Sequence, residues 1–392
     1  MGGTRMAEFE PRNAFEHVDK LAYEIGPRLA GTRGDRMATE YIQKKFESYG
    51  LKPQAQGFKF VNRQARSKVT ACLFAAAFIT SLFLPEFALI VWFVAVILWR
   101  SLGKIMSKHE SQNITAVQKV EEPKKRVAVT AHYDSAPCMV SYRLHIFLRF
   151  TLLPAISIIS IVLILHMLKL VPAWPIVWAL LALFFLPICA GVFISASAKR
   201  VSPGANDNAS GVAVMLEVAR VLAESPTPNV ELRFIAFGAE EQGLVGASKL
   251  VKEKLLPPDT LVLNLDMVGA GHQAYIIEGN GILRRTKTSI RLNQALTDSI
   301  QRAGLKPKLF WAALAGHDHI PLVRAKIQAT TFSFDTPGVD KLGQRISKLF
   351  GLPNARTRGY RHIHTSNDTP DRLELANIER AGLVVLDFVK AI

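Results

Sequence analysis

The chain has 392 residues, of which 49% are hydrophobic and 20% are charged. This length and composition exclude a disordered chain and a disulfide-stapled mini-protein, and they allow two or three domains with cores of their own. The three cysteines, Cys72, Cys138 and Cys189, show no zinc-motif spacing, and their odd number argues against a disulfide framework. The net charge of +16 is typical of proteins that bind nucleic acid, an anionic membrane surface or an acidic substrate.

Helical periodicity at the start of the chain predicts helices over 13–25 and 32–49, each ended by a glycine turn. An apolar run, Val69 to Trp99, then extends over 31 residues with Glu86 as its only charge. As one helix it would be roughly 46 Å long against a bilayer core of about 30 Å. We therefore predict a membrane insertion over 67–102 that forms a hairpin bent at Pro85 and Glu86.

Two strands are predicted next, over 113–120 and 126–132, and the polar turn between them is typical of a hairpin. Two uncharged runs of 19 and 29 residues follow, Phe150 to Leu168 and Leu170 to Ala198. Each is long enough to cross a bilayer. They predict a transmembrane helical hairpin over 144–199, with Lys169, Pro172 and Pro175 at its turn.

Basic residues gather at the ends of these apolar runs, on the side that is joined to the polar segments. Under the positive-inside rule this pattern predicts an integral, multi-pass membrane protein whose polar part lies on the cytoplasmic face. The N-terminal sequence has no apolar core typical of a signal peptide. No nucleic-acid recognition motif accompanies the charge, so the expected partner is the lipid bilayer. The flanking bases are Arg63, Arg66, Lys68, Arg100, Lys104, Lys108, Arg143, Arg149, Lys199 and Arg200.

The rest of the chain alternates helix and strand patterns. Helices are expected over 209–223, from 244, over 286–303 and over 375–392, and strands over 230–237, 261–267 and 328–334. Such alternation predicts an α/β fold in which a mixed, mostly parallel sheet is flanked by helices. The polar segments 1–66, 103–143 and 200–392 are expected to form this one domain, interrupted by the inserted transmembrane hairpins.

Imidazoles and carboxylates follow the predicted strands, at the sheet edge where α/β proteins bind ligands. Taken singly, each has an ordinary explanation, such as a core histidine, a helix N-cap or a solvated turn. Together they indicate a site, because five separate accidents would have to place such groups at one edge. The candidates are His132 and Asp134, Asp207 at a helix start, Glu240 and Glu241, Asp266, and His364.

Two histidines and three carboxylates match the ligands that two divalent cations need, and the absence of thiolates suits zinc. Asp207 suits a bridging ligand, because the small residues after it allow a close approach. Glu240 and Glu241 point in opposite directions in an extended chain, so one can bind metal while the other faces a bridging water. Asp134 lies two residues from His132 and is expected to orient its imidazole.

The motifs HxDS at 132–135, GAxDNASG at 204–211, EExGLxG at 240–246, NLDM at 264–267 and HT at 364–365 resemble those of the M28 family of zinc aminopeptidases and carboxypeptidases. The resemblance implies a zinc-exopeptidase fold and a metallo-exopeptidase that hydrolyses peptide bonds. It assigns His132 and Asp266 to one zinc and Glu241 and His364 to the other. It makes Asp207 the bridge and Glu240 the general base.

Two alternatives share the fold implied by this resemblance. Residues 316–322, GHDHIPL, are similar to a segment of glutaminyl cyclases, which are zinc acyltransferases. An inactive membrane chaperone of the nicalin type is the other, and retention of the whole ligand set argues against it. The apolar insertions depart from the family pattern, and they suggest hydrophobic or membrane-associated peptides as substrates.

Overall fold

The computed structural model of the chain describes residues 8–84, 87–138, 142–170, 175–282, 284–313, 315–334 and 361–392. The chain divides into two compact units, and each is interrupted in sequence by the other. The first unit contains Met1–Phe58, Glu110–Pro137 and Val201–Ile392, and the second contains Lys59–His109 and Cys138–Arg200.

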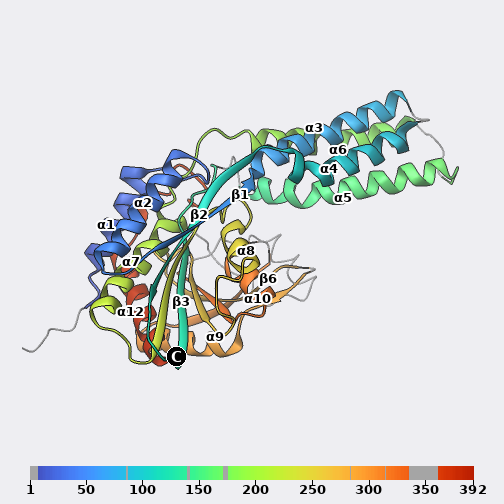
Figure 1. The fold of residues 1–392 in the computed structure, drawn as a ribbon. Helices are drawn as coiled ribbons and strands as arrows, with labels where there is room; N and C mark the ends of the chain where they lie inside the picture. Colours follow the sequence, from blue (N-terminus) through green and yellow to red (C-terminus); the bar gives the residue numbers. More distant parts are fainter. Residues whose placement is uncertain are drawn as a thin grey trace, which may run out of the picture. The chain divides into compact units, whose positions relative to one another are not determined.

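The first unit is built around one sheet (Figure 1). Its described strands follow the order β1-β2-β4-β3-β5-β9-β6-β7, with β8 paired to β6. Strands β4, β3, β5 and β9 run parallel, whereas β2 is antiparallel to β4 and β6 is antiparallel to β9. The predicted mixed sheet is thereby confirmed. The strands are β1 (Gln54–Val61), β2 (Lys108–Gln118), β3 (Lys125–His132), β4 (Val230–Phe237), β5 (Leu261–Leu265), β6 (Ala274–Asn280), β7 (Thr286–Lys287), β8 (Pro307–Ala312) and β9 (Ala329–Ser333).

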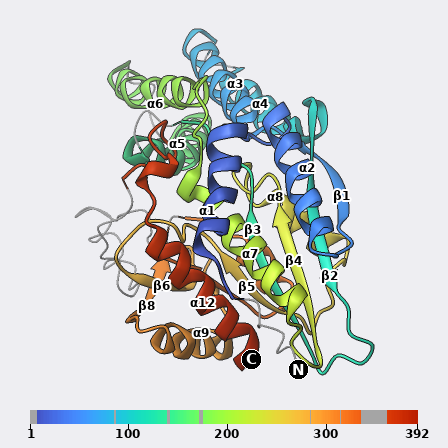
Figure 2. The same cartoon turned by 90° about the vertical axis from the view of Figure 1, so that its left-hand side faces the viewer.

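Side chains of β3 alternate between two cores, as the two-residue period of a strand requires. Val127, Val129 and Ala131 belong to the core under α1, α2, α7, α9 and α12, whereas Ala128 belongs to the core under α8 and α10. Figure 2 shows α1, α7 and α12 side by side over the first face. The helices are α1 (Pro11–Asp19, continued by a π-helical turn over Lys20–Ile25), α2 (Arg33–Ser48), α7 (Ser210–Glu224), α8 (Val245–Lys252), α9 (Ile290–Arg302), α10 (His319–Arg324) and α12 (Leu375–Ala391).

Helix α7 is buried from Ser210 to Ala219 on all its sides. It packs on β3 and is covered by α1 and α12, so the stretch from Ser210 to Ala219 has no solvent-facing stripe. This position explains its content of small and β-branched apolar residues, because only such side chains fit between a sheet and two helices.

The predicted hairpin between 113–120 and 126–132 is wrong, because β4 lies between these two strands. β2 pairs antiparallel with β4, and β3 pairs with the other edge of β4 in parallel. A polar turn between two strand patterns does not reveal whether the strands are neighbours. Here the apolar β4 is buried between them, and this long-range burial outweighs the local turn.

The predicted helix over 286–303 begins later than expected. Thr286 and Lys287 form the short strand β7, and α9 begins at Ile290 after Ser289, whose side chain accepts a hydrogen bond from the Leu292 N–H. This N-cap sets the start of the helix. Strands β1, β6 and β8 were not predicted. β6 and β8 show no regular alternation of buried and exposed residues, whereas β1 does alternate at Phe58, Lys59 and Phe60.

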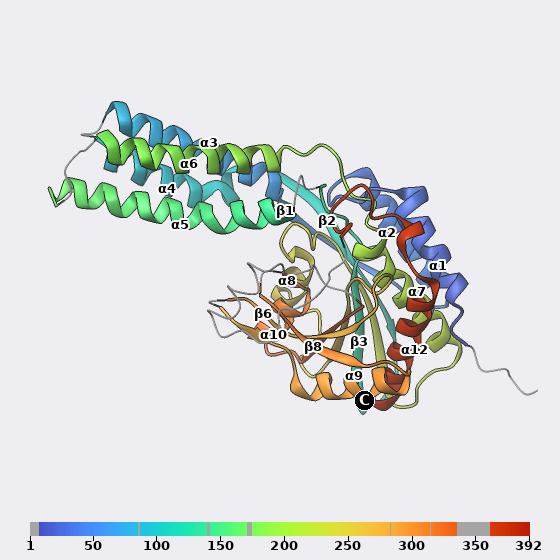
Figure 3. The same cartoon turned by 180° about the vertical axis from the view of Figure 1, so that it is seen from behind.

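The described residues of the second unit form four helices, α3 (Arg63–Phe83), α4 (Ala88–Ile105), α5 (Tyr142–Met167) and α6 (Pro175–Ala196) (Figure 3). Among the described residues, three helical stretches are long and apolar enough to cross a membrane: Arg63–Phe83, Ala88–Ile105 and Val177–Ala196. The first apolar run thus forms two helices. Pro85 and Glu86, where we expected its bend, and Pro172, expected at the second turn, lie outside the described residues.

The four helices share a core of aromatic and small side chains. Phe74, Phe78, Trp92 and Phe185 are buried within it, and the indole N–H of Trp92 donates a hydrogen bond to Ser160 Oγ at 2.6 Å. The outer faces are apolar as well. Phe83, Phe93 and Phe184 are 79%, 64% and 70% exposed, which is unusual for a helix bundle in water.

Candidate metal centre

The predicted site residues come from strand ends and turns of the first unit, at the carboxyl end of the parallel strands. Because parallel strands end at the same edge, residues distant in sequence meet there. His132 ends β3, Asp134 lies two residues beyond it, Asp207 lies in the turn before α7, Glu240 and Glu241 follow β4, Asp266 follows β5, and His364 lies in the turn that precedes α12.

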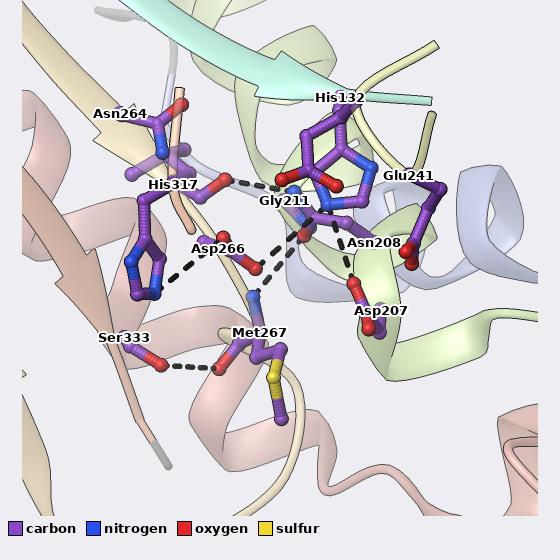
Figure 4. Close-up of polar contacts among 12 residues, drawn as sticks. His132, Asp207, Asn208, Gly211, Glu241, Asn264, Asp266, Met267, His317 and Ser333 are labelled. Carbon is purple, nitrogen blue, oxygen red and sulfur yellow. Dashed lines mark hydrogen bonds and ion pairs between the residues drawn. The ribbon is translucent and has the colours of Figure 1, made fainter. Parts of the chain in front are cut away.

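Asp207 is shared by two groups of metal-ligand side chains. One group is His132, Asp207 and Asp266, and the other is Asp207, Glu241 and His364; within each, ligand atoms lie within 4.8 Å of one another. Asp207 Oδ1 is 3.2 Å from His132 Nε2, whereas Oδ2 is 3.0 Å from His364 Nε2. His364 Nε2 is also 3.0 Å from Glu241 Oε1. Figure 4 shows the first group, with Glu241 beside it.

The site holds more carboxylates than imidazoles in a buried space. Burial lowers the pKa of His132 and His364, but nearby carboxylates outweigh it and raise both pKa values well above the ordinary range. Burial would raise the pKa of Asp207, yet its hydrogen bonds to these two histidines lower it. Burial also raises the pKa of Glu240 and Glu241. A cation would relieve the excess negative charge.

The donor set fits divalent cations of the zinc type. Each group offers one imidazole nitrogen and two carboxylates, and no thiolate, which is a donor set found in zinc sites. The two Asp207 oxygens face different groups, as the carboxylate of a two-metal site must. The residues present are therefore able to hold two ions with Asp207 between them.

Asp134 holds the turn that carries Glu240 and Glu241. Its two carboxylate oxygens accept hydrogen bonds from the Glu240 N–H at 2.9 Å and the Glu241 N–H at 3.2 Å. The expected contact with His132 is looser, since Asp134 Oδ1 is 3.7 Å from Nδ1 and the Asp134 carbonyl oxygen is 3.2 Å from it. Asp134 thus connects the end of β3 to the turn after β4.

Gly238 allows this turn to approach β2 closely. A Cβ at this position would lie 2.5 Å from the Gln112 carbonyl oxygen and 2.6 Å from both Ser111 Oγ and the Tyr133 hydroxyl. These distances are far below van der Waals contact, so any side chain would displace the turn that carries Glu240.

Asp368 was not among the predicted site residues, although it supports the Asp207 turn directly. Its carboxylate accepts hydrogen bonds from the Asn206 N–H at 2.8 Å and the Asp207 N–H at 3.1 Å. Asn208 fixes the other side of the turn, by accepting from the Met267 N–H and donating to the Leu265 carbonyl. The peptide bond between Asp207 and Asn208 is cis. The one sequence signal for Asp368 was its position four residues after His364.

Arg28 is a second unpredicted residue, and its side chain is fully buried. Its guanidinium donates hydrogen bonds to carbonyl oxygens on three separate segments: Leu21 and Gly26, then Tyr133, then Pro203 and Gly204. Tyr133 is the residue after His132, and Gly204 lies three residues before Asp207. Arg28 therefore joins the loops that carry these two side chains. Burial lowers its pKa to about 10 against the opposing effect of nearby aspartates, so it stays charged at neutral pH.

The segment GHDHIPL at 316–322, which was compared with glutaminyl cyclases, lies beside the site. His317 Nε2 is 3.9 Å from Asp266 Oδ2, and the rings of His317 and His319 stack with centroids 5.7 Å apart. Asp318 is fully buried, and burial raises its pKa to about 8. The sequence indicated this segment, but the contact with Asp266 was not predicted.

Comparison with known proteins identifies the family to which the chain is similar. The family model of peptidase family M28 matches residues 191–389. Aminopeptidase YwaD of Bacillus subtilis is 35% identical over 195 residues, which are 47% of this chain and 36% of YwaD. The chain thus corresponds to about a third of that relative's length.

Solved structures share the fold. A zinc-dependent exopeptidase from Parabacteroides distasonis superposes with a TM-score of 0.62 and 16% identity, covering 99% of this chain and 100% of the other. A glutaminyl cyclase from Bacteroides thetaiotaomicron gives a TM-score of 0.60, 16% identity and the same coverage. The zinc-exopeptidase-like fold is thereby confirmed. Because the family match extends over half of the sequence, the chain belongs to peptidase family M28.

Proposed function

We propose that the protein is a membrane-embedded metallo-exopeptidase, specifically a two-zinc aminopeptidase. The observation that carries the proposal is the carboxylate of Asp207, whose two oxygens face His132 and His364 at 3.2 and 3.0 Å. Asp266 completes the first ligand group and Glu241 the second. The name of the Bacillus relative, an aminopeptidase, supports the choice of the amino end.

Each residue has a distinct part in hydrolysis. When bound, two zinc ions supply Lewis-acid chemistry, by lowering the pKa of water and polarising a carbonyl. Glu240 takes up a proton from the attacking water and passes it to the leaving amine. Asp134 keeps Glu240 in place through the backbone N–H at 2.9 Å.

The test replaces Glu240 with glutamine, which keeps the size of the side chain and removes its basicity. We expect Glu240→Gln to lose turnover by a factor of about 100 to 10,000 while retaining the zinc content of the wild type. Glu122→Gln changes an exposed glutamate outside the site and serves as the matched control. An unchanged rate in Glu240→Gln, or parallel loss of rate and zinc, contradicts the assignment of Glu240 as the base.

A panel of peptides tests the reaction itself. Peptides with a free amino end should be cleaved, and the same peptides acetylated at that end should resist. Cleavage of the acetylated peptides, together with resistance of peptides that are amidated at the carboxyl end, would indicate a carboxypeptidase. A peptide with N-terminal glutamine is included, because release of ammonia without cleavage would indicate cyclisation and contradict the proposal.

The membrane part of the proposal depends on the second unit. Its helices α3, α4 and α6 contain the stretches able to cross a bilayer, and their outer faces carry exposed aromatic residues such as Phe93 and Phe184. The chain leaves the first unit at Pro137, three residues after Asp134, and returns to it at Val201. Both insertions start and end in the same unit, so each requires an even number of crossings; in the second insertion the shorter apolar helix Thr151–Met167 would have to provide the other crossing. We infer that hydrophobic or membrane-associated peptides are the preferred substrates.

The orientation is tested in vesicles of known sidedness. The bases that flank the helices support a cytoplasmic position of the first unit under the positive-inside rule. An epitope added after Ile392 should therefore be digested by protease in inside-out vesicles and protected in right-side-out vesicles. Protection of the epitope in inside-out vesicles, with digestion in right-side-out vesicles, would overturn the cytoplasmic assignment.

A further inference from the structure

His317 lies between β8 and α10 and is 6% exposed. Its Nδ1 is 2.9 Å from Asn280 Nδ2, at the end of β6, and its Nε2 is 3.9 Å from Asp266 Oδ2. The ring therefore lies between a neutral amide on one side and a carboxylate of the first ligand group on the other (Figure 4 shows the contact with Asp266).

The tautomer of His317 follows from the partners of Asn280. Asn280 Nδ2 donates a hydrogen bond to the Ala315 carbonyl oxygen at 2.8 Å. A carbonyl only accepts, so the amino group of the amide must face this side. The second hydrogen of that amino group points to His317 Nδ1, which accepts it. A neutral imidazole carries one ring proton, and this proton is therefore on Nε2.

The proton on Nε2 has two consequences. His317 has no lone pair on the nitrogen that faces Asp266, so it cannot act as an additional metal ligand there. It is instead a hydrogen-bond donor directed at Asp266 Oδ2. The other oxygen, Asp266 Oδ1, is 3.9 Å from His132 Nε2 and belongs to the ligand group. The two oxygens of Asp266 thus face different neighbours.

We propose that His317 is a positioning residue, which donates a hydrogen bond from Nε2 to Asp266 Oδ2 and thereby presents Oδ1 to the ion beside His132. A shift of about 1 Å brings the two atoms to hydrogen-bond distance. Hydrogen bonds of this kind to a ligating carboxylate orient it and increase metal affinity. The inference rests on the proposed metal centre, and it adds Asn280 as the residue that sets the tautomer.

The experiment measures the two zinc affinities by competition with a chromophoric chelator, on the full chain in detergent. We expect His317→Ala to weaken one zinc affinity by about 10- to 100-fold and to leave the other unchanged. His317→Gln should restore most of the loss, because the glutamine amide N–H takes the place of Nε2–H. His272→Ala is the matched control, since the side chain of His272 is 93% exposed.

The outcomes separate this inference from the proposed function. A wild-type protein that binds fewer than two zinc ions refutes the metal centre and the inference with it. A wild-type protein that binds two, with a His317→Ala variant that binds both as tightly, refutes the positioning role alone. Nitrogen NMR of labelled histidine, assigned with His317→Gln, gives an independent readout: a proton on Nε2 supports the inference, and a proton on Nδ1 overturns it even if the alanine variant does not fold.

Discussion

Replacing Asp207 and Asp134 separately with asparagine separates a bridging ligand from a supporting residue. Both substitutions remove one negative charge at nearly constant volume, and both side chains are buried. Asp207 belongs to both ligand groups, whereas Asp134 belongs to neither. We therefore expect Asp207→Asn to lose far more zinc than Asp134→Asn.

The magnitudes follow from the contacts of each carboxylate. Asparagine at 134 keeps one acceptor oxygen for the Glu240 N–H, 2.9 Å away in the wild type. The loss of a supporting carboxylate costs about 10- to 100-fold in metal affinity, or about 1.4 to 2.8 kcal/mol. Asp207 loses a charged contact in each of two groups, at about 1.5 to 3 kcal/mol for each. The sum of about 3 to 6 kcal/mol corresponds to two to four orders of magnitude.

The assay is zinc content after dialysis against a graded series of zinc buffers, measured on purified protein by atomic emission. Asp134→Asn should regain two ions at raised free zinc, whereas Asp207→Asn should stay depleted over the same range. Asp259→Asn, in an exposed turn just before β5, controls for the loss of charge as such. Equal occupancy of the Asp207 and Asp134 variants would refute the bridging role.

Three further predictions concern stability. Arg28→Ala leaves five carbonyl oxygens without their buried donor and should lower the free energy of unfolding by about 3 to 5 kcal/mol. The control Arg36→Ala changes an exposed arginine and should leave the stability unchanged. Equal thermal midpoints of the two variants would contradict the prediction. Burial raises the pKa of Asp35 to about 7, so ionisation of this side chain disfavours the folded state. The free energy of unfolding of the wild type should therefore fall by on the order of 4 kcal/mol as the pH rises from about 4 to above 7. Asp35→Asn should remove this fall, and parallel pH profiles of stability for the wild type and the variant would refute the prediction. Trp92→Phe removes the hydrogen bond to Ser160 and should lower the free energy of unfolding in detergent by about 0.6 to 1.7 kcal/mol. If the lost hydrogen bond is the cause, adding Ser160→Ala to this variant should lower the stability no further.

The candidate site residues could be singled out from the sequence because ligands bind beyond the carboxyl ends of the strands in α/β folds. His132, Asp266 and the pair Glu240 and Glu241 each stand directly after an apolar strand pattern, so local pattern and function coincide. The mixed sheet and its flanking helices were predictable for the same reason, since burial on both faces makes central strands apolar throughout. The apolar helices of the second unit were visible as long runs with at most one charged residue, although the apolar part of α5, Thr151–Met167, is shorter than the three stretches able to span a membrane.

Strand neighbours and supporting contacts depended on the tertiary structure. The order β2-β4-β3 cannot be predicted from the local sequence pattern. Which strands pair depends on hydrogen bonds and packing with strands that are distant in the chain, such as β4. Arg28 and Asp368 bond to backbone groups, which every residue has, so no sequence motif reveals their partners. The proton on His317 is set by Asn280, which lies 37 residues away in the chain. Sequence alone determined which chemical groups are present at the sheet edge, since His132, the pair Glu240 and Glu241, and Asp266 come at the ends of strands. Only the fold decided how they are held, because hydrogen-bond partners and tautomers depend on atoms brought together from distant parts of the chain.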